Sequence, residues 1–299
     1  MENFLGFEYF LDVHKRVYYI YIISSLILAL LYLSINQKEK RVNLSSKLWW
    51  HKSARLDYGY FFISNLIKIL LVFPIVLSSK TIALSTIMFL SDTFGYIRVN
   101  LSYEVILVLF TSTLFIISDF TRYFLHRFLH TVPLLWRFHK VHHSAKVLNP
   151  LTFYRVHPVE NLLFGFRYVL SMGIVSGVFI YLFGSKVDIY DVVGVNIFVF
   201  VFSILGSNLR HSHIKLSYPK VLETVLISPY MHQIHHSTKF FNRNYGGTLA
   251  IWDYMFNTHK FSKQVKTVKF GLKKEQMGDY DSIIKLLITP FRMSKIENQ

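Results

Sequence analysis

The sequence contains no cysteine among its 299 residues. This absence excludes disulfide scaffolds, iron–sulfur clusters, thiolate zinc sites and a cysteine nucleophile. Charged residues are scarce, at 17% against about 25% in a typical soluble domain. Acidic residues are the scarcest of these, 17 against 33 lysines and arginines, while 17% of the chain is aromatic, which excludes an acidic disordered protein. The remaining composition, 52% hydrophobic with a net charge of +16, predicts a basic membrane protein.

Five apolar runs approach the roughly 20 residues that a helix needs to cross a bilayer. They are Tyr18–Ile35, Gly59–Leu77, Val105–Phe120, Leu162–Phe183 and Val192–Leu209. A sixth run, Ile82–Leu90, is too short to cross and predicts a re-entrant or interfacial segment. The sequence therefore predicts an all-α integral membrane protein with four to five transmembrane helices. We expect three regions: an N-terminal transmembrane region (1–104), a histidine-rich core with transmembrane helices (105–260) and a basic C-terminal cytosolic tail (261–299).

Lysine and arginine alternate between rich and poor segments along the chain. Six lie in Asn36–Tyr58, two between the next two runs, six in Thr121–Glu160, one at Lys186 and fourteen after Leu209. The positive-inside rule places the rich segments in the cytosol, as a helical cap on a multi-pass protein. These basic residues flank apolar runs and form no separate domain, so we expect anionic lipid head groups as partners and no nucleic acid.

Eleven of the fourteen histidines lie within a window of 111 residues, and they come in spaced groups. The groups are HRFLH (His126, His130), HKVHH (His139, His142, His143), His157 alone, HSH (His211, His213) and HQIHH (His232, His235, His236). Positions i, i+3 and i+4 share one helix face, so we expect each larger group to aim its imidazoles at a common point. Neutral imidazole is a ligand for iron, zinc, copper and nickel.

A structural interpretation competes with the metal for any single histidine. His14, His51 and His259 are each interpreted as a polar tip at the membrane surface or a hydrogen-bonding residue. Packing many imidazoles together without a metal would only cost desolvation, so the spaced groups predict a metal site. A zinc ion usually takes four ligands and an octahedral iron six, so this pool of histidines predicts two metals. The three larger groups contain no Asp or Glu, which excludes the Glu-x-x-His site of four-helix bundles.

The order H-x-x-x-H, H-x-x-H-H, H-x-x-H-H resembles the fatty acid hydroxylase/sterol desaturase superfamily of integral-membrane di-iron oxidases. The resemblance extends over DFTRYFLHRFLHTVPLLWRFHKVHHSAKVLNPLTFYRVHPVE (Asp119–Glu160), SNLRHSHIKL and SPYMHQIHHSTKFFNRNYGGTLAIWDYMFNT (Ser228–Thr258). It covers about half of the chain, from Asp119 to His259, whereas the N-terminal third is similar only in being apolar.

The resemblance implies a cytosol-facing centre of two iron ions, with zinc as a substitute, molecular oxygen as co-substrate and a lipid as substrate. The implied ligands are His126, His130, His139, His142, His143, His211, His232, His235 and His236. His157 and His213 are further candidates with competing interpretations. His213 is two residues from His211, a spacing that does not share a helix face, and a hydrogen bond to Glu160 suits His157 nearly as well as a metal does.

Two carboxylates are candidates for orienting the ligands, because a ligating imidazole normally donates its second N–H to a carboxylate or carbonyl. Asp119 lies seven residues before His126 and shares a helix face with it, although pairing with Arg122 or Arg127 is the alternative. Asp253, in the WDYMF run, is expected to orient a ligand of the third group.

The predicted function is that of an O2-dependent oxidoreductase that hydroxylates or desaturates a lipid C–H bond. With no G-x-G-x-x-G fingerprint and no cysteine, the electrons are expected from a separate reductase, ferredoxin or cytochrome. A zinc-dependent membrane hydrolase is an alternative, weakened by the surplus of histidines and the missing H-E-x-x-H. A metal transporter or sensor without enzymatic activity is another, weakened because the histidines lie outside the apolar runs or at their ends.

Overall fold

The computed structural model describes residues 7–72, 78–184, 187–188, 191–192 and 195–292, and their regular secondary structure is almost entirely helical. The α-helices are α1 (Tyr19–Ile35), α2 (Gln37–Asn43), α3 (Ser46–Trp49), α4 (Lys52–Ile67), α5 (Ser79–Phe94), α6 (Tyr103–Thr131), α7 (Pro133–His143), α8 (Pro158–Phe183), α9 (Ile197–Ile204), α10 (Lys220–Glu223), α11 (Pro229–His235), α12 (Ile251–Met255) and α13 (Ile283–Ile288). The strands β1 (Asp191–Val192) and β2 (Val195–Asn196) form one antiparallel pair.

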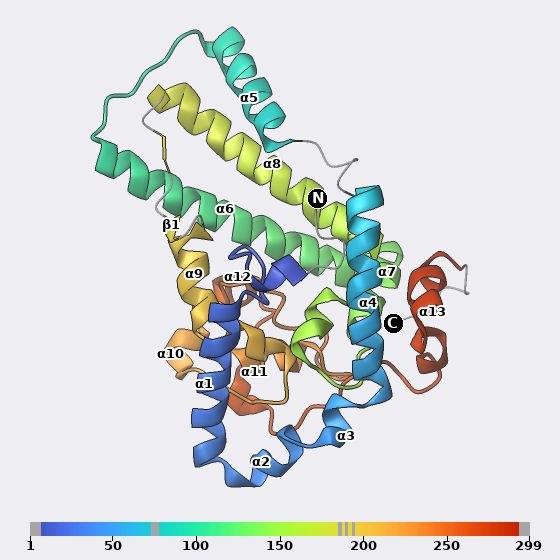
Figure 1. Cartoon of the computed structure of the whole chain (residues 1–299). Helices are drawn as coiled ribbons and strands as arrows, with labels where there is room; N and C mark the ends of the chain where they lie inside the picture. Colours follow the sequence, from blue (N-terminus) through green and yellow to red (C-terminus); the bar gives the residue numbers. More distant parts are fainter. Residues whose placement is uncertain (1–6, 73–77, 185–186, 189–190, 193–194, 293–299) are drawn as a thin grey trace.

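Two long helices, α6 and α8, are the framework of the molecule (Figure 1). Ser102 begins α6, where its Oγ accepts a hydrogen bond from the Val105 N–H, and Pro158 occupies the first turn of α8. Both helices are long and apolar enough to cross a bilayer, by length and composition. Helix α5 packs along α8 at close range, since a Cβ on Gly173 would lie 2.5 Å from the Cβ of Ile82.

The predicted apolar runs are helical, with three differences. The run Gly59–Leu77 divides into α4 and a π-helical turn, Lys68–Val72, and its last residues lie outside the described part of the chain. The short run around Ile82–Leu90 belongs to α5, which at 16 residues is longer than expected. The run Val192–Leu209 was expected as one helix, and this prediction is wrong.

Among the described residues of that last run, only the eight of α9 form an α-helix. The Asn196 side chain caps its first turn by accepting a hydrogen bond from the Phe198 N–H, and Gly206, with a φ of 91°, turns the chain after its end. Eight helical residues span about 12 Å, well short of a bilayer. The number of membrane spans therefore stays a prediction.

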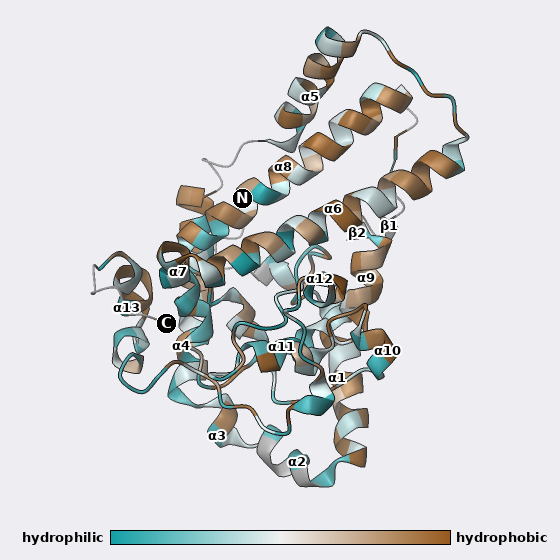
Figure 2. Ribbon diagram, turned by 180° about the vertical axis from the view of Figure 1, so that it is seen from behind, coloured by the Kyte–Doolittle hydropathy of each residue, from teal (hydrophilic) through white to brown (hydrophobic). Residues whose placement is uncertain are grey.

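Large apolar side chains remain exposed along the helices. Ile23, Leu26 and Leu30 on α1 are 51–56% exposed, and Met88 and Phe89 on α5 are each 65% exposed. Hydrophobic residues also follow most of α6, α8 and α9 (Figure 2). Contiguous apolar surface of this kind marks contact with a membrane or another protein.

Beneath the ends of α6 and α8 lies a cap formed by α7, α11, α12 and their connecting loops, with α1 and α4 on opposite sides of it (Figure 1). The C-terminal segment packs onto this cap, because Tyr280 and Leu286 share a buried cluster with Tyr60 of α4 and Val141 of α7. The division into three regions at 104 and 260 stays a prediction.

Candidate metal centre

Nine buried histidines lie together at the boundary between the long helices and the cap. The first group is His126, His130, His139, His143 and His235, and the second group is His142, His211, His232 and His236. Within each group, one ring nitrogen of every histidine lies within 4.8 Å of the others. These nine are the residues that the sequence analysis named as ligands, and His157 and His213 lie outside both groups.

The second and third sequence motifs are divided between the two groups, so the expectation of one common point for each motif is wrong for both. His139 and His143 of α7 face the first group, while His142 faces the second. His232 and His236 face the second group, while His235 faces the first. Because successive helical residues are rotated by about 100°, neighbours such as His142 and His143 necessarily point in different directions.

Hydrogen bonds fix the orientation of the rings in the first group. The Nδ1–H of His126 donates to the Tyr245 carbonyl (2.7 Å) and that of His235 to the Arg243 carbonyl (2.8 Å). His139 Nδ1 donates to Glu160 Oε1 (2.9 Å). Because these acceptors take the Nδ1 proton, each of the three rings keeps its Nε2 lone pair free to bind a metal.

In the second group the Nε2 atoms crowd together. His211 Nε2 lies 3.3 Å from that of His232 and 3.1 Å from that of His236, and the last two are 3.2 Å apart. His142 Nε2 is 3.3 Å from His211 Nε2, and its Nδ1 donates to the Arg155 carbonyl (3.3 Å).

This crowding tests the fit to a metal. Each Nε2 carries either one proton or one lone pair, so N–H···N bonds do not satisfy three mutually close nitrogens. Two nitrogens bound to one ion at about 2.1 Å lie about 3.0 Å apart at a right angle and about 3.4 Å apart at a tetrahedral angle. The observed separations of 3.1–3.3 Å therefore fit nitrogens that share one cation.

Burial keeps these imidazoles neutral. It lowers the pKa of His139 to about 3 and that of His142 to about 4. The pKa values of His211, His232, His235 and His236 also lie well below their usual range, mainly because of burial. At neutral pH the rings are uncharged, which is the form that binds metal ions.

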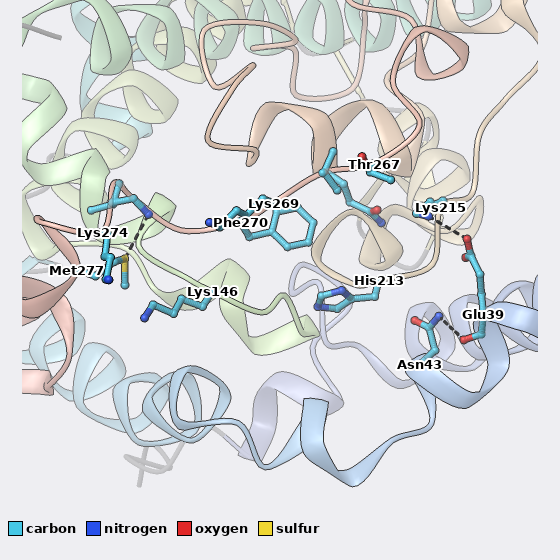
Figure 3. A pocket seen from close by; sticks show the side chains of 13 residues that line it. Glu39, Asn43, Lys146, His213, Lys215, Thr267, Lys269, Phe270, Lys274 and Met277 are labelled. Carbon is cyan, nitrogen blue, oxygen red and sulfur yellow. Dashed lines mark hydrogen bonds and ion pairs between the residues drawn. The ribbon is translucent and has the colours of Figure 1, made fainter.

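His157 and His213 have other partners. His157 caps the start of α8, where its Nδ1 accepts a hydrogen bond from the Val159 N–H, and its Nε2 donates to the Leu287 carbonyl. His213 accepts a hydrogen bond from the Leu148 N–H (3.2 Å). It lines a separate cavity of about 720 Å³ near Phe270 and several lysines (Figure 3). The hydrogen bond between His157 and Glu160, the alternative to metal ligation, is not formed either.

Neither predicted carboxylate contacts an imidazole, as the hydrogen bonds of each show. Asp119 accepts from the Thr248 and Leu249 N–H groups and from Trp252 Nε1, which fastens the loop before α12 to α6. Asp253 accepts from the Tyr245 and Gly246 N–H groups. It thereby holds the peptide whose carbonyl binds His126, so its effect is on the first motif and not the third.

Two further features that support the site were not predicted from the sequence. Glu160 binds His139, and its position in the first turn after His157–Pro158 was the available signal. Arg155 and Asp57, each at most 1% exposed, form a buried ion pair, and Asp57 also accepts from Asn149 Nδ2 and Thr152 Oγ1. Nothing in the sequence links Asp57 of α4 to a partner 98 residues away.

Comparison with known proteins now bears on this geometry. A model of the family described as fatty acid hydroxylase matches residues 110–258, about half of the chain and the part that holds all nine histidines. The chain belongs to the fatty acid hydroxylase family.

The curated relatives of this chain include enzymes whose names specify different lipids. The ornithine lipid hydroxylase OlsE of Rhizobium tropici is 27% identical over 52% of this chain and 44% of its own length. Human alkylglycerol monooxygenase is 26% identical over 52% of this chain and 31% of its own. The Delta(7)-sterol 5(6)-desaturase of Eremothecium gossypii is 26% identical over 64% of this chain and 48% of its own.

The matches therefore cover less than half of each of these relatives. No solved structure matches the chain.

Proposed function

We propose that this family member is a membrane-bound di-iron oxidase that hydroxylates or desaturates a C–H bond of a lipid, using O2 and external electrons. The observation that carries the proposal is the pair of adjoining groups of buried, neutral imidazoles. The names of the relatives, which are a hydroxylase, a monooxygenase and a desaturase of lipids, support the same class of reaction.

The donor set suits two metal ions. In this proposal the first group holds one ion with up to five nitrogens and the second group holds the other with four. An octahedral ion accepts six ligands, so both would keep at least one open position, and zinc would substitute because it also binds imidazole. A bound iron pair supplies the oxidising power that an unactivated C–H bond requires.

The chain's own residues prepare this chemistry. Burial keeps the imidazoles deprotonated, and Glu160 together with the Tyr245 and Arg243 carbonyls fixes the direction of three rings. Trp136 and Phe241 stack at 5.3 Å beside His130, whose side chain is fully buried. The two ions would therefore lie in a dry site whose ligands are already oriented.

The remaining expectations belong to the same proposal. We infer a multi-pass protein with the histidines on the cytosolic side, because the basic segments lie around the cap. A separate reductase, ferredoxin or cytochrome would donate electrons there, and the lysines of the cavity in Figure 3 would attract an acidic partner.

The decisive experiment measures oxygen consumption by the iron-loaded full chain in detergent, with a chemical reductant and a panel of lipids. We expect consumption with at least one lipid, whose product gains one oxygen atom or loses two hydrogens by mass spectrometry. The zinc-loaded chain is the control and should leave oxygen untouched. A protein that contains two irons and consumes no oxygen with any lipid would favour the hydrolase or the transporter.

A further inference from the structure

A second cavity, of about 640 Å³, borders the second group of histidines between α6, α8, α9 and the segment before α1. Phe153 lines this cavity, and its ring lies edge-on to His211 at 5.9 Å between centroids. Arg210, which also lines it, directly precedes His211 in the chain. Arg122, on α6, lies one helical turn before His126.

The cavity has a basic side near the cap and an apolar side away from it. Helix α6 runs toward the histidines and α8 runs away from them, so the two are antiparallel. Leu114 and Phe115 precede Arg122 by about two turns, and Met172 follows Arg167 by more than one. These apolar side chains therefore lie farther from the cap than the two arginines.

The basic side has more positive than negative charge. Six lysines and arginines line the cavity, against one carboxylate, Asp119. Asp119 is already engaged by two backbone N–H groups and Trp252, and of the six cations Lys15 pairs with Asp12. Within the described part of the chain no ion pair involves the other five, which are Arg16, Lys68, Arg122, Arg167 and Arg210.

Several of these cations retain unused donors. Arg167 Nη1 donates to the Ser118 carbonyl at 2.7 Å, whereas its buried Nε has no partner among the described residues. The same holds for Nη2 of Arg16. Arg122 forms no hydrogen bond with a described residue, and its charged group lies 5.6 Å from the centre of the Phe164 ring. Cations held in protein at membrane depth are costly unless an anion accompanies them.

We propose that this cavity binds the acid group, a carboxylate or a phosphate, of an anionic lipid whose alkyl chain lies along the apolar side. On the proposed function, this lipid is the substrate that the cavity presents to the histidine centre. The unpaired arginines, the apolar wall at one end and the contact of Phe153 with His211 at the other support this assignment. A free anion would use only the basic side and leave the apolar wall without a role.

The test measures lipid binding and does not require enzymatic activity. The full chain in a neutral detergent, without added metal, is titrated with oleate and dioleoyl phosphatidate, and bound lipid is counted by native mass spectrometry. Oleyl alcohol and dioleoylglycerol are the uncharged partners of these lipids, and inorganic phosphate represents a free anion. We expect each acid lipid to bind about tenfold more tightly than its uncharged partner, because charged hydrogen bonds would be lost.

Variants locate the binding. Arg122→Gln and Lys68→Gln should each weaken acid-lipid binding about tenfold. Both are suitable because neither side chain forms a hydrogen bond within the described residues, so folding depends little on them. Lys266→Gln removes the same charge from an exposed position outside the cavity and should change nothing.

Three results would overturn the proposal: equal binding of acid and uncharged lipids, unchanged binding by both cavity variants, or inorganic phosphate binding as tightly as the lipids. None of them depends on oxygen consumption. A protein that binds acid lipids through Arg122 and consumes no oxygen would refute the proposed oxidase and leave this site standing.

Discussion

The two groups of histidines differ in what holds their rings. In the first group three rings donate Nδ1–H to partners outside the group, one of them the carboxylate of Glu160. In the second group His142 donates to a carbonyl, whereas Nδ1 of His211 and of His232 has no partner among the described residues. The first group is therefore organised by the fold, and the second depends more on the ion that its nitrogens would share.

This difference suggests unequal metal sites. An imidazole that donates to a carboxylate is a stronger and better oriented ligand, so we expect the first group to bind its ion more tightly. Phe153, which lines the basic cavity, contacts the ring of His211 in the second group, so we expect the ion of this group to be the one nearer the lipid. The predictions below test this inequality, beginning with the largest expected effect.

Removing a ligand from the first group should have the largest effect. His139 contacts three other rings of that group, since its ring centroid is 4.7–5.0 Å from those of His130, His143 and His126. We expect His139→Ala to lose the ion of the first group and all oxygen consumption, because no other donor replaces the nitrogen. Metal content per folded protein, by mass spectrometry of eluted metal, is the measurement.

His213→Ala is the matched control, since His213 is also a histidine of the cap, half-buried, and lies outside both groups. It should keep both ions. Equal metal content in the two variants would show that the grouping of the nine histidines is not a metal site.

Breaking the ion pair between Asp57 and Arg155 should have the second largest effect. Asp57→Asn leaves the buried guanidinium without its anion, and breaking a buried pair in this way costs about 3–5 kcal/mol of unfolding free energy. Because the Arg155 carbonyl accepts from His142, the ion of the second group should be lost first as the protein is warmed. Thermal unfolding in detergent, followed together with metal release, is the measurement.

Asp281→Asn is the comparison for that variant, because Asp281 pairs with Lys52 and Lys285 at 40% exposure. An exposed pair is worth about 1 kcal/mol or less. A similar loss of stability in both variants would contradict the structural role given to Arg155.

Much of this site follows from local spacing, and the rest does not. Pairs of histidines four residues apart, such as His126 and His130, share a face in the structure as their spacing predicts. Local spacing alone left open whether His142 or His143 faces the same point as His139, because positions i+3 and i+4 are both near i. The positions of the other helices decide it.

Long-range partners could not be predicted from the sequence for a similar reason. Asp119 was predicted to orient His126 because the two share a helix face, but the loop before α12 supplies two donors to it and Trp252 of α12 supplies a third. Val192–Leu209 is apolar enough for one helix, yet the cap at Asn196 and the turn at Gly206 shorten it to α9. Both outcomes depend on residues distant in sequence or on backbone geometry, which composition does not describe.

Glu160 provides a finer test of the inequality. Glu160→Gln keeps the shape of the side chain and removes the charge that His139 Nδ1–H faces. Loss of such a partner weakens metal affinity about 10–100-fold, and we expect this only for the first group. Competition with a chelator, followed as stepwise metal loss, is the measurement. A variant that releases both ions together would show that the two groups are coupled and not independent.

Lowering the pH tests the property that the two groups share, which is the burial of their imidazole rings. In the metal-free protein burial lowers the pKa of His139 to about 3 and that of His142 to about 4, below the value of about 6.5 in an unfolded chain. Between about pH 6.5 and 4 the unfolded chain therefore binds protons that the folded protein does not. Stability should fall with falling pH, by about 1.4 kcal/mol per pH unit for each such histidine.

Thermal unfolding of the metal-free chain between pH 7 and 4.5 measures this loss, and a His142→Gln variant calibrates the share of one ring. The stability of that variant should depend less steeply on pH. Gln does not titrate, so the unfolded chain takes up one proton fewer relative to the folded protein. A midpoint that stays constant down to pH 4.5 would mean that water reaches the rings and that neither group is enclosed. The inequality between the groups would then rest on hydrogen bonds alone, without the dry surroundings that make those bonds strong.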